Sequence, residues 1–252
     1  MPSISEECPH YGDACDLASQ DESFFSTFKR NNFYRAVLEH VSEEQGLMYY
    51  SEIDSASDIR KNIQKFSIND KLGSPFVHEY EFGTFSPTTL RYAKVLYDIS
   101  SLVDLNSSKI AEIGAGYGGQ YVVMRQLFRP AGYSFFDIEP AIKLIRKYTK
   151  TLVSDEENIN FNISGSEVEA DDYDLVISNY AISECECEVQ DYYIKNVISR
   201  SKRGYITHNH MRGYSIDEFI SKLEDLGKSP SVREERPQTS PPSSRKNVII
   251  TW

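Results

Sequence analysis

A glycine-rich turn directly after an apolar run constrains this chain more than any other feature. The segment Ile110–Gly119 reads Ile-Ala-Glu-Ile-Gly-Ala-Gly-Tyr-Gly-Gly, which predicts a buried strand, a tight turn and the start of a helix. Gly114, Gly116 and Gly118 permit backbone conformations that a Cβ disfavours, and they let a ligand lie against the main chain. The segment therefore predicts a ligand site at the end of a buried strand.

The charge of this turn indicates which ligand it binds. Gly114, Gly116 and Gly119 match the G-x-G-x-x-G pattern of dinucleotide-binding proteins. A pyrophosphate favours N–H donors and positive charge, yet the nearest charge before the glycines is the carboxylate of Glu112, and the first cation after them is Arg125. An acidic turn without lysine suits a cationic ligand. S-adenosylmethionine (SAM), which carries an ammonium and a sulfonium and no phosphate, fits better than a nicotinamide dinucleotide.

Composition limits the class of partner. The chain has 252 residues, a net charge of −11 and a pI near 5.0. A protein that binds a phosphate backbone needs a basic footprint, so nucleic acid is disfavoured and a small-molecule or glycan substrate is expected. The basic residues Lys143, Arg146, Lys147 and Lys150 are spaced as the solvated face of a helix. Oligomeric state does not follow from the sequence.

Targeting and cysteine signals point to the cytoplasm. No apolar run approaches the length of a membrane span, and residues 1–20 are polar, without the hydrophobic core of a signal peptide. Cys8 and Cys15 could pair or join His10 at a metal, whereas Cys185 and Cys187 are too close together for a usual disulfide. We expect four reduced thiols, no metal and a cytoplasmic location.

Alternating strand and helix patterns predict an α/β fold with a mostly parallel seven-stranded sheet and an antiparallel last strand. The expected strands are residues 109–113, 133–138, 158–163, 173–178, 204–207, 232–235 and 247–252. The expected helices between them are residues 119–128, 140–152, 189–201 and 216–226.

The region before the first of these strands reads differently. Residues 1–20 suggest a loose lead-in, 22–64 are dominated by helical patterns, and 72–87 suggest an ordered, aromatic loop. Ser86-Pro87 then starts a helix that runs to about residue 102. We expect two units: a helical cap with a cofactor-covering loop over residues 1–85, and a SAM-binding core over residues 86–252.

In an open parallel sheet, ligands bind outside the carboxyl ends of the strands, so polar residues there are candidates. Asp137 ends the second strand, where a carboxylate can accept both ribose hydroxyls; Glu139 is an alternative, and Asp137 could instead cap a helix. Asn179 and Glu184 follow the fourth strand. Glu184 could orient or deprotonate a hydroxyl, or it could complement a helix dipole.

Two histidines follow the fifth strand. His208 and His210 would point the same way if the strand continues, and imidazole titrates near neutral pH, which suits a general base. A structural role or metal binding stays open. His208 is our candidate for the base, with His210 and Glu184 as substitutes.

Six motifs within about residues 70–210 together resemble one family. They are Gly73-Ser74-Pro75, Phe85-Ser86-Pro87 with Leu90-Arg91-Tyr92, Glu112–Gly119, Asp137-Ile138-Glu139-Pro140, Asn179 with Ser183-Glu184, and Tyr205 with His208-Asn209. Their order and spacing resemble the bacterial sugar O-methyltransferases, within the class I SAM-dependent methyltransferases, whose members are associated with surface polysaccharide synthesis. The resemblance implies the Rossmann-like fold of that superfamily and SAM as cofactor.

The resemblance also implies roles for individual residues. The glycine motif would line the methionine half of SAM, Asp137 would hold the ribose, Asn179 and Glu184 would face the methyl donor and acceptor, and a loop with Tyr80 would close over the cofactor. The expected cofactor-binding residues are Glu112, Gly114, Ala115, Gly116, Gly118, Asp137, Ile138, Asn179 and Tyr80.

Three other functions stay open at this point. The glycine spacing permits a nicotinamide-dependent oxidoreductase. A non-catalytic scaffold with the SAM fold would bind SAM weakly and show no turnover. A methyltransferase could also act on another small metabolite or on a protein side chain, although Ser178-Asn179-Tyr180-Ala181 lacks the Asn-Pro-Pro-Tyr type of motif for amino groups, which favours oxygen as acceptor.

Overall fold

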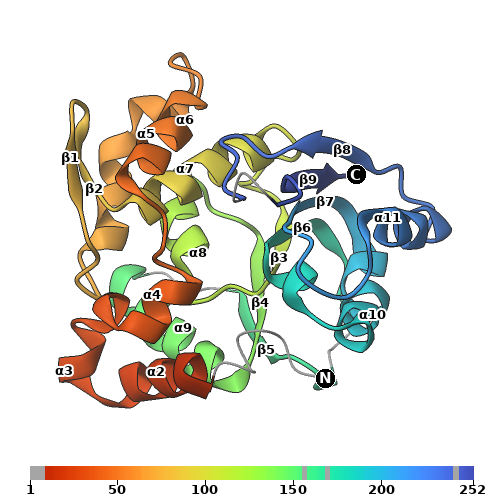
Figure 1. The fold of residues 1–252 in the computed structure, drawn as a ribbon, viewed down its shortest axis with the longest axis horizontal. Coiled ribbons are helices and arrows are strands. Elements are labelled where there is room, and N and C mark those ends of the chain that lie inside the picture. Colours follow the sequence, from red (N-terminus) through yellow and green to blue (C-terminus); the bar gives the residue numbers. More distant parts are fainter. Residues whose placement is uncertain (1–8, 155–157, 168–170, 241–243) are drawn as a thin grey trace.

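A seven-stranded sheet forms the centre of the computed structural model, which describes residues 9–154, 158–167, 171–240 and 244–252 (Figure 1). Its strand order is β5-β4-β3-β6-β7-β9-β8. The strands are β3 (Lys109–Ile113), β4 (Gly132–Asp137), β5 (Ile159–Ile163), β6 (Tyr173–Asn179), β7 (Ser201–His208), β8 (Ser231–Glu234) and β9 (Val248–Thr251). The first five run parallel, and β9 lies antiparallel between β7 and β8. The predicted seven-stranded α/β fold is therefore confirmed.

Helices cover both faces of the sheet, as Figure 1 shows. On one face lie α7 (Pro87–Ser100), α8 (Gly119–Met124) and α9 (Glu139–Leu152). On the other lie α10 (Cys187–Asn196), η4 (Ile198–Arg200) and α11 (Ile216–Asp225). Successive strand residues point to opposite faces of the sheet: Ile110 packs in the hydrophobic core under the first group of helices, and Ala111 packs in the core under the second. The parallel strands thus leave their carboxyl ends at one edge, where a ligand site is expected.

The N-terminal region consists of short helices and one hairpin. The helices are α2 (Pro9–Gln20), α3 (Glu22–Phe25), η1 (Phe28–Arg30), α4 (Asn32–Val37), α5 (Glu43–Ser51), α6 (Asp58–Lys61) and η2 (Ile63–Asp70). The hairpin is β1 (His78–Tyr80) with β2 (Gly83–Phe85). The helical reading of residues 22–64 is confirmed, and so is the start of α7, because the Ser86 side chain caps its first turn and Pro87 follows.

Two predictions for this region were wrong. Residues 9–20 are not a loose lead-in: α2 packs on α9 and buries Tyr11, Ala14, Cys15 and Ala18. This i, i+3, i+4, i+7 spacing is the apolar stripe of an amphipathic helix. The predicted loop of residues 72–87 holds the β1–β2 hairpin, because Phe82 stacks between rings of its neighbours and fixes the turn.

The basic face of α9 is only partly solvated. Lys143 Nζ lies 3.0 Å from the Asp16 carboxylate, and Lys147 Nζ lies 2.8 Å from Glu22. Both contacts tie α9 to α2 and α3. None of the described helices combines the length and the apolar character needed to cross a lipid bilayer.

Candidate functional site

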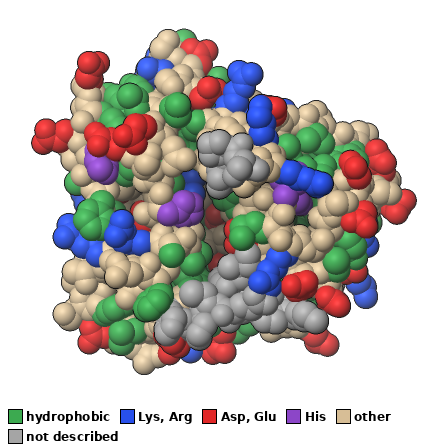
Figure 2. Space-filling view, in the orientation of Figure 1, with side chains coloured by type: hydrophobic (Ala, Val, Ile, Leu, Met, Phe, Trp, Pro, Cys, Tyr) green, Lys and Arg blue, Asp and Glu red, His purple; other side chains and the backbone are tan. Residues whose placement is uncertain are grey.

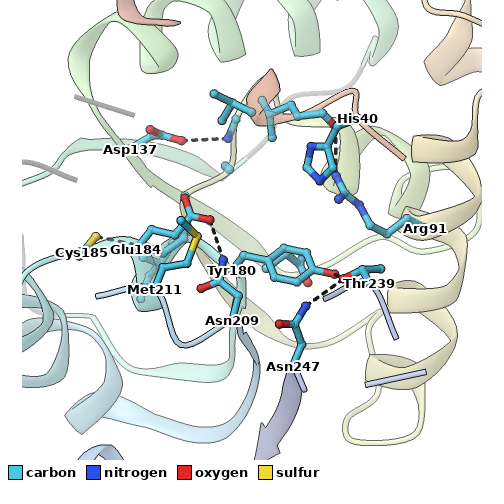
Figure 3. A pocket seen from close by; sticks show the side chains of 18 of the residues that line it. His40, Arg91, Asp137, Tyr180, Glu184, Cys185, Asn209, Met211, Thr239 and Asn247 are labelled. Atoms are coloured by element: carbon cyan, nitrogen blue, oxygen red, sulfur yellow. Dashed lines mark hydrogen bonds between the residues drawn. The ribbon is translucent and has the colours of Figure 1, made fainter. Parts of the chain in front are cut away.

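A cavity of about 720 Å³ opens at the carboxyl ends of β3, β4 and β6. Figure 2 shows the face on which it forms a hollow, and Figure 3 shows its side chains. We call the side built on these strand ends the strand-end wall; it includes Glu112, Gly114, Gly116, Asp137 and Asn179. We call the opposite side the outer wall; it includes His40, Arg91, Thr239, Arg245 and Asn247.

At the glycine turn, the strand-end wall is formed mainly by main-chain atoms. Gly114 has φ +72°, and a Cβ there would lie 1.9 Å from the Ala181 Cβ. Gly116 has φ +62°, and its Cβ would lie 2.8 Å from Leu38 Cδ1 in the segment after α4. Both positions therefore require glycine for backbone conformation and for space. Ala115 lines the cavity between them.

Two carboxylates stand beside this turn. Asp137 accepts hydrogen bonds from the Gly116 and Ile138 backbone N–H groups, both at 2.8 Å. Glu112 accepts one from the Tyr133 hydroxyl at 2.7 Å, and burial raises the pKa of Glu112 to about 8. The structure thus gathers both predicted acids, together with Ile138, at one cavity.

The end of β6 adds amide and carboxyl groups. The Asn179 Oδ1 atom is buried and has no hydrogen-bond partner among the described residues. Tyr180 has φ +68°, a strained conformation for a residue with a Cβ. The strain turns the chain into η3 (Ala181–Glu184), which brings Glu184 to the cavity.

Glu184 lies at the meeting point of two strand ends. Its Oε1 accepts a hydrogen bond of 2.8 Å from the Asn209 side-chain amide, and Asn209 Oδ1 accepts one of 2.7 Å from Ser183 Oγ. Burial raises the pKa of Glu184. A carboxylate held in one orientation, with a raised pKa and an open cavity beside it, is suited to accept a proton from a ligand.

The outer wall is assembled from distant segments, and Figure 3 shows it facing Glu184 and Asn209. Buried Glu235 organises part of it, because it accepts hydrogen bonds from the hydroxyls of Tyr180 and Thr239 and from the Asn247 amide. His40 and Arg91 stand beside each other in the same view. The sequence predicted no site role for His40, Arg91, Glu235 or Asn247; a charged residue, Arg91, at a buried position of α7 was a local signal for one of them.

The structure does not bring His208 and His210 to the cavity wall. His208 ends β7, where the alternation of a strand directs it to the same face as Ile206, and its ring lies 6.2 Å from that of Phe219. Burial lowers the pKa of His208 to about 4. His210 has φ +59°, so the strand does not continue, and its Nε2 lies 2.9 Å from the Lys246 carbonyl oxygen. The strand does not continue as the alignment of the two histidines required, and Asn209, rather than His208 or His210, lines the cavity.

Two predicted cofactor residues also lie away from the cavity. Gly118 has φ +86°, and a Cβ at this position would lie 3.0 Å from Thr149 Cγ2, so this glycine serves the contact between the turn and α9. Tyr80 belongs to β1, and its hydroxyl donates to the Glu43 carbonyl oxygen at 3.2 Å. Neither residue lines the cavity.

The metal site considered in the sequence analysis would have joined Cys8, Cys15 and His10. Cys8 and the side chain of His10 lie outside the described residues. Cys15 is fully buried, and burial raises the pKa of its thiol. Cys15, Cys185 and Cys187 form no disulfide within the described part of the chain.

No protein-family model matches the chain, and no curated protein matches it significantly. Solved structures do resemble it. The magnesium protoporphyrin IX methyltransferase from Synechocystis PCC 6803 with bound SAM aligns with a TM-score of 0.50 and 14% identity, over 86% of this chain and 93% of that one. The precorrin-6y C5,15-methyltransferase from Geobacter metallireducens GS-15 aligns at 0.44 and 18% identity, over 64% and 86%. The first likeness establishes the SAM-methyltransferase Rossmann-like fold.

Proposed function

We propose that this protein is a SAM-dependent methyltransferase that methylates a hydroxyl group of a sugar, in glycan or surface polysaccharide synthesis. One observation carries the proposal: a cation-free glycine turn, two carboxylates and an unpaired amide oxygen line the same cavity. These acceptor groups suit a ligand with an ammonium and hydroxyls, and they do not suit a pyrophosphate.

The residues of the strand-end wall fit SAM. Asp137 is placed to accept ribose hydroxyls, because its carboxylate faces the cavity at the end of β4. Glu112 and the Asn179 Oδ1 atom are acceptors suited to the ammonium of the methionine part. Gly114 and Gly116 leave room for the ligand against the backbone. When bound, SAM would supply an activated methyl group and leave as S-adenosylhomocysteine (SAH).

Glu184 is our candidate for the general base. Its carboxylate lines the cavity, and Asn209 holds its orientation. In the proposed reaction the acceptor hydroxyl loses its proton to Glu184 while its oxygen forms the bond to the methyl carbon. Since the methyl group is already activated, alignment and proton removal are the tasks left to the protein.

A sugar is the proposed acceptor on two grounds. The end of β6 lacks the Asn-Pro-Pro-Tyr type of motif, which favours oxygen over nitrogen. The outer wall offers side-chain hydroxyl and amide groups at Thr239, Ser240 and Asn247, which suit a ligand with several hydroxyls. The six-motif resemblance to sugar O-methyltransferases points the same way.

The proposal is tested with methyl-labelled SAM and a panel of acceptors that contains free sugars, nucleotide sugars, catechols and amines. We expect label transfer to at least one sugar and none to the amines. Transfer only to a non-sugar would keep the methyltransferase and overturn the sugar assignment. SAH binding without transfer to any acceptor would favour the scaffold function.

A further inference from the structure

Arg91 is a buried cation without an anionic partner in the described chain. It lies in the first half of α7 and is 6% exposed. Its guanidinium makes one hydrogen bond, to the Leu38 carbonyl oxygen at 3.2 Å. No carboxylate of the described residues lies within 4.0 Å of it. Since a buried charge is costly unless it is paired, this arginine needs an explanation.

The same helix shows the usual solution three residues further on. Lys94 is equally buried, at 4% exposure, and its Nζ lies 2.5 Å from the Asp98 carboxylate. Asp98 also accepts hydrogen bonds from Tyr205 and Arg233, so this cation belongs to a complete network inside the protein. Arg91 has no such network, which indicates that its partner comes from outside the chain.

The groups around Arg91 do not neutralise it. Tyr92 and Tyr180 place their rings about 5.8 Å from the guanidinium carbon, a contact that stabilises a cation only weakly. Glu39 lies in the segment after α4, and burial raises its pKa, but no ion pair of 4.0 Å or less joins its carboxyl group to Arg91 among the described residues. Arg91 lines the cavity, and each of its side-chain nitrogens either has a hydrogen-bond partner or is reached by solvent. Its free N–H donors are therefore available to a ligand.

We propose that Arg91 is the oxyanion-binding residue of this cavity and pairs with a carboxylate or phosphate of a bound ligand. A guanidinium presents a planar fork of donors that matches two oxygens of such a group. The cavity then has acids on the strand-end wall and a buried cation on the outer wall, so it selects ligands with separated charges. The inference rests on the proposed function where the bound oxyanion is the carboxylate of SAM.

Two sources can supply the oxyanion. One is the α-carboxylate of SAM itself, because the Leu38 carbonyl that holds Arg91 belongs to the residue that contacts Gly116. The other is an anionic acceptor, such as a sugar phosphate or a sugar acid. The ligand chemistry is the same in both, and binding experiments separate them.

The test compares the wild type with Arg91→Gln, Arg91→Lys and the control Arg203→Gln, which removes an exposed arginine of β7 that does not line the cavity. Thermal melting checks that each variant is folded. The probes are SAH, 5′-methylthioadenosine, which lacks the amino-acid part, and glucose 1-phosphate against glucose, each with and without SAH.

If Arg91 binds the SAM carboxylate, Arg91→Gln loses at least about tenfold in SAH affinity and keeps its affinity for 5′-methylthioadenosine. If it binds an acceptor anion, SAH affinity is retained and the preference for glucose 1-phosphate over glucose disappears. Arg91→Lys should be intermediate, since it keeps the charge and loses the fork. Arg203→Gln should change each affinity by less than about threefold, because this exposed charge lies outside the cavity.

Unchanged affinities for SAH and glucose 1-phosphate in Arg91→Gln, or equal losses in Arg203→Gln, would overturn the inference. Failure of the wild type to bind SAH would instead contradict the proposed function. In that case, binding of glucose 1-phosphate that depends on Arg91 would still support the oxyanion site, and its absence would overturn that site as well.

Discussion

The two walls of the cavity are built in different ways. The strand-end wall comes from the last residues of three strands and from the turns that follow them directly, and it is acidic and rich in backbone groups. The outer wall comes from the segment after α4, from α7 and from the chain between β8 and β9, and it carries the buried cation Arg91. The first wall is therefore fixed by the sheet, whereas the second depends on tertiary packing. We assign cofactor binding mainly to the first wall and acceptor selection to the second.

The largest effect should come from filling the glycine turn. In Gly114→Ala the new Cβ would lie 1.9 Å from Ala181, at φ +72°. Gly227→Ala is the matched control, because Gly227 has φ +73° and nothing within 4 Å. We expect Gly114→Ala to lose at least about 100-fold in SAH affinity and roughly 3 kcal/mol or more in unfolding free energy, against about 1 kcal/mol for the control. Equal losses would show that the close contact with Ala181 is unimportant.

The second prediction tests whether Glu184 or a histidine is the general base. Glu184→Gln keeps the shape and a hydrogen-bond acceptor for Asn209 but cannot take a proton, so turnover should fall by about 10²–10⁴-fold while SAH affinity changes little. His210→Gln should leave turnover within about twofold, since His210 does not line the cavity. Single-turnover methyl transfer measures both, and a larger loss in His210→Gln would return the base to the histidines.

A moderate effect should follow from weakening the proposed ribose contact. Asp137→Asn removes the charge that accepts the Gly116 and Ile138 N–H groups and that faces the cavity. SAH affinity should fall about 10- to 100-fold. Glu139→Gln, at an exposed position that pairs with Lys143, should leave it unchanged. Titration calorimetry decides between them, and a loss confined to Glu139→Gln would move the ribose contact to that residue.

The smallest effect is on stability and concerns Glu112. Burial raises its pKa to about 8, above the ordinary value of 4.5. The native state therefore binds more protons between these values, so this group makes stability fall as pH rises from about 4.5 to about 8 and contributes no further change above that. Between about pH 4.5 and about pH 8, the Tm of Glu112→Gln should therefore fall less than that of the wild type, by a few degrees or more. The same dependence of Tm on pH in both proteins would contradict a raised pKa of Glu112 in the folded state.

The strand-end wall could be predicted because its signals are local. Glu112, Gly114 and Asp137 sit next to strong strand patterns, and the parallel sheet brings strand ends together by its topology. The direction of a side chain at a strand end was less predictable. The alignment of His208 with His210 required the strand to continue, but β7 ends at His208, and Asn209 lines the cavity instead.

The outer wall could not be predicted, because its residues meet only through long-range packing. Arg91 and Asn247 are far apart in sequence, and Glu235 reaches Tyr180 across the sheet edge. The helix α2 is an intermediate case. Its apolar stripe was present in the sequence, but the polar composition of residues 1–20 outweighed it in our interpretation.

Calorimetric titration with SAH, with NADH as a parallel ligand, tests the central claim most directly. The account predicts micromolar SAH binding that Asp137→Asn weakens, and no NADH binding, because the glycine turn carries an acid and no cation. Binding of NADH in place of SAH would contradict the assignment of the strand-end wall to a cationic, phosphate-free cofactor.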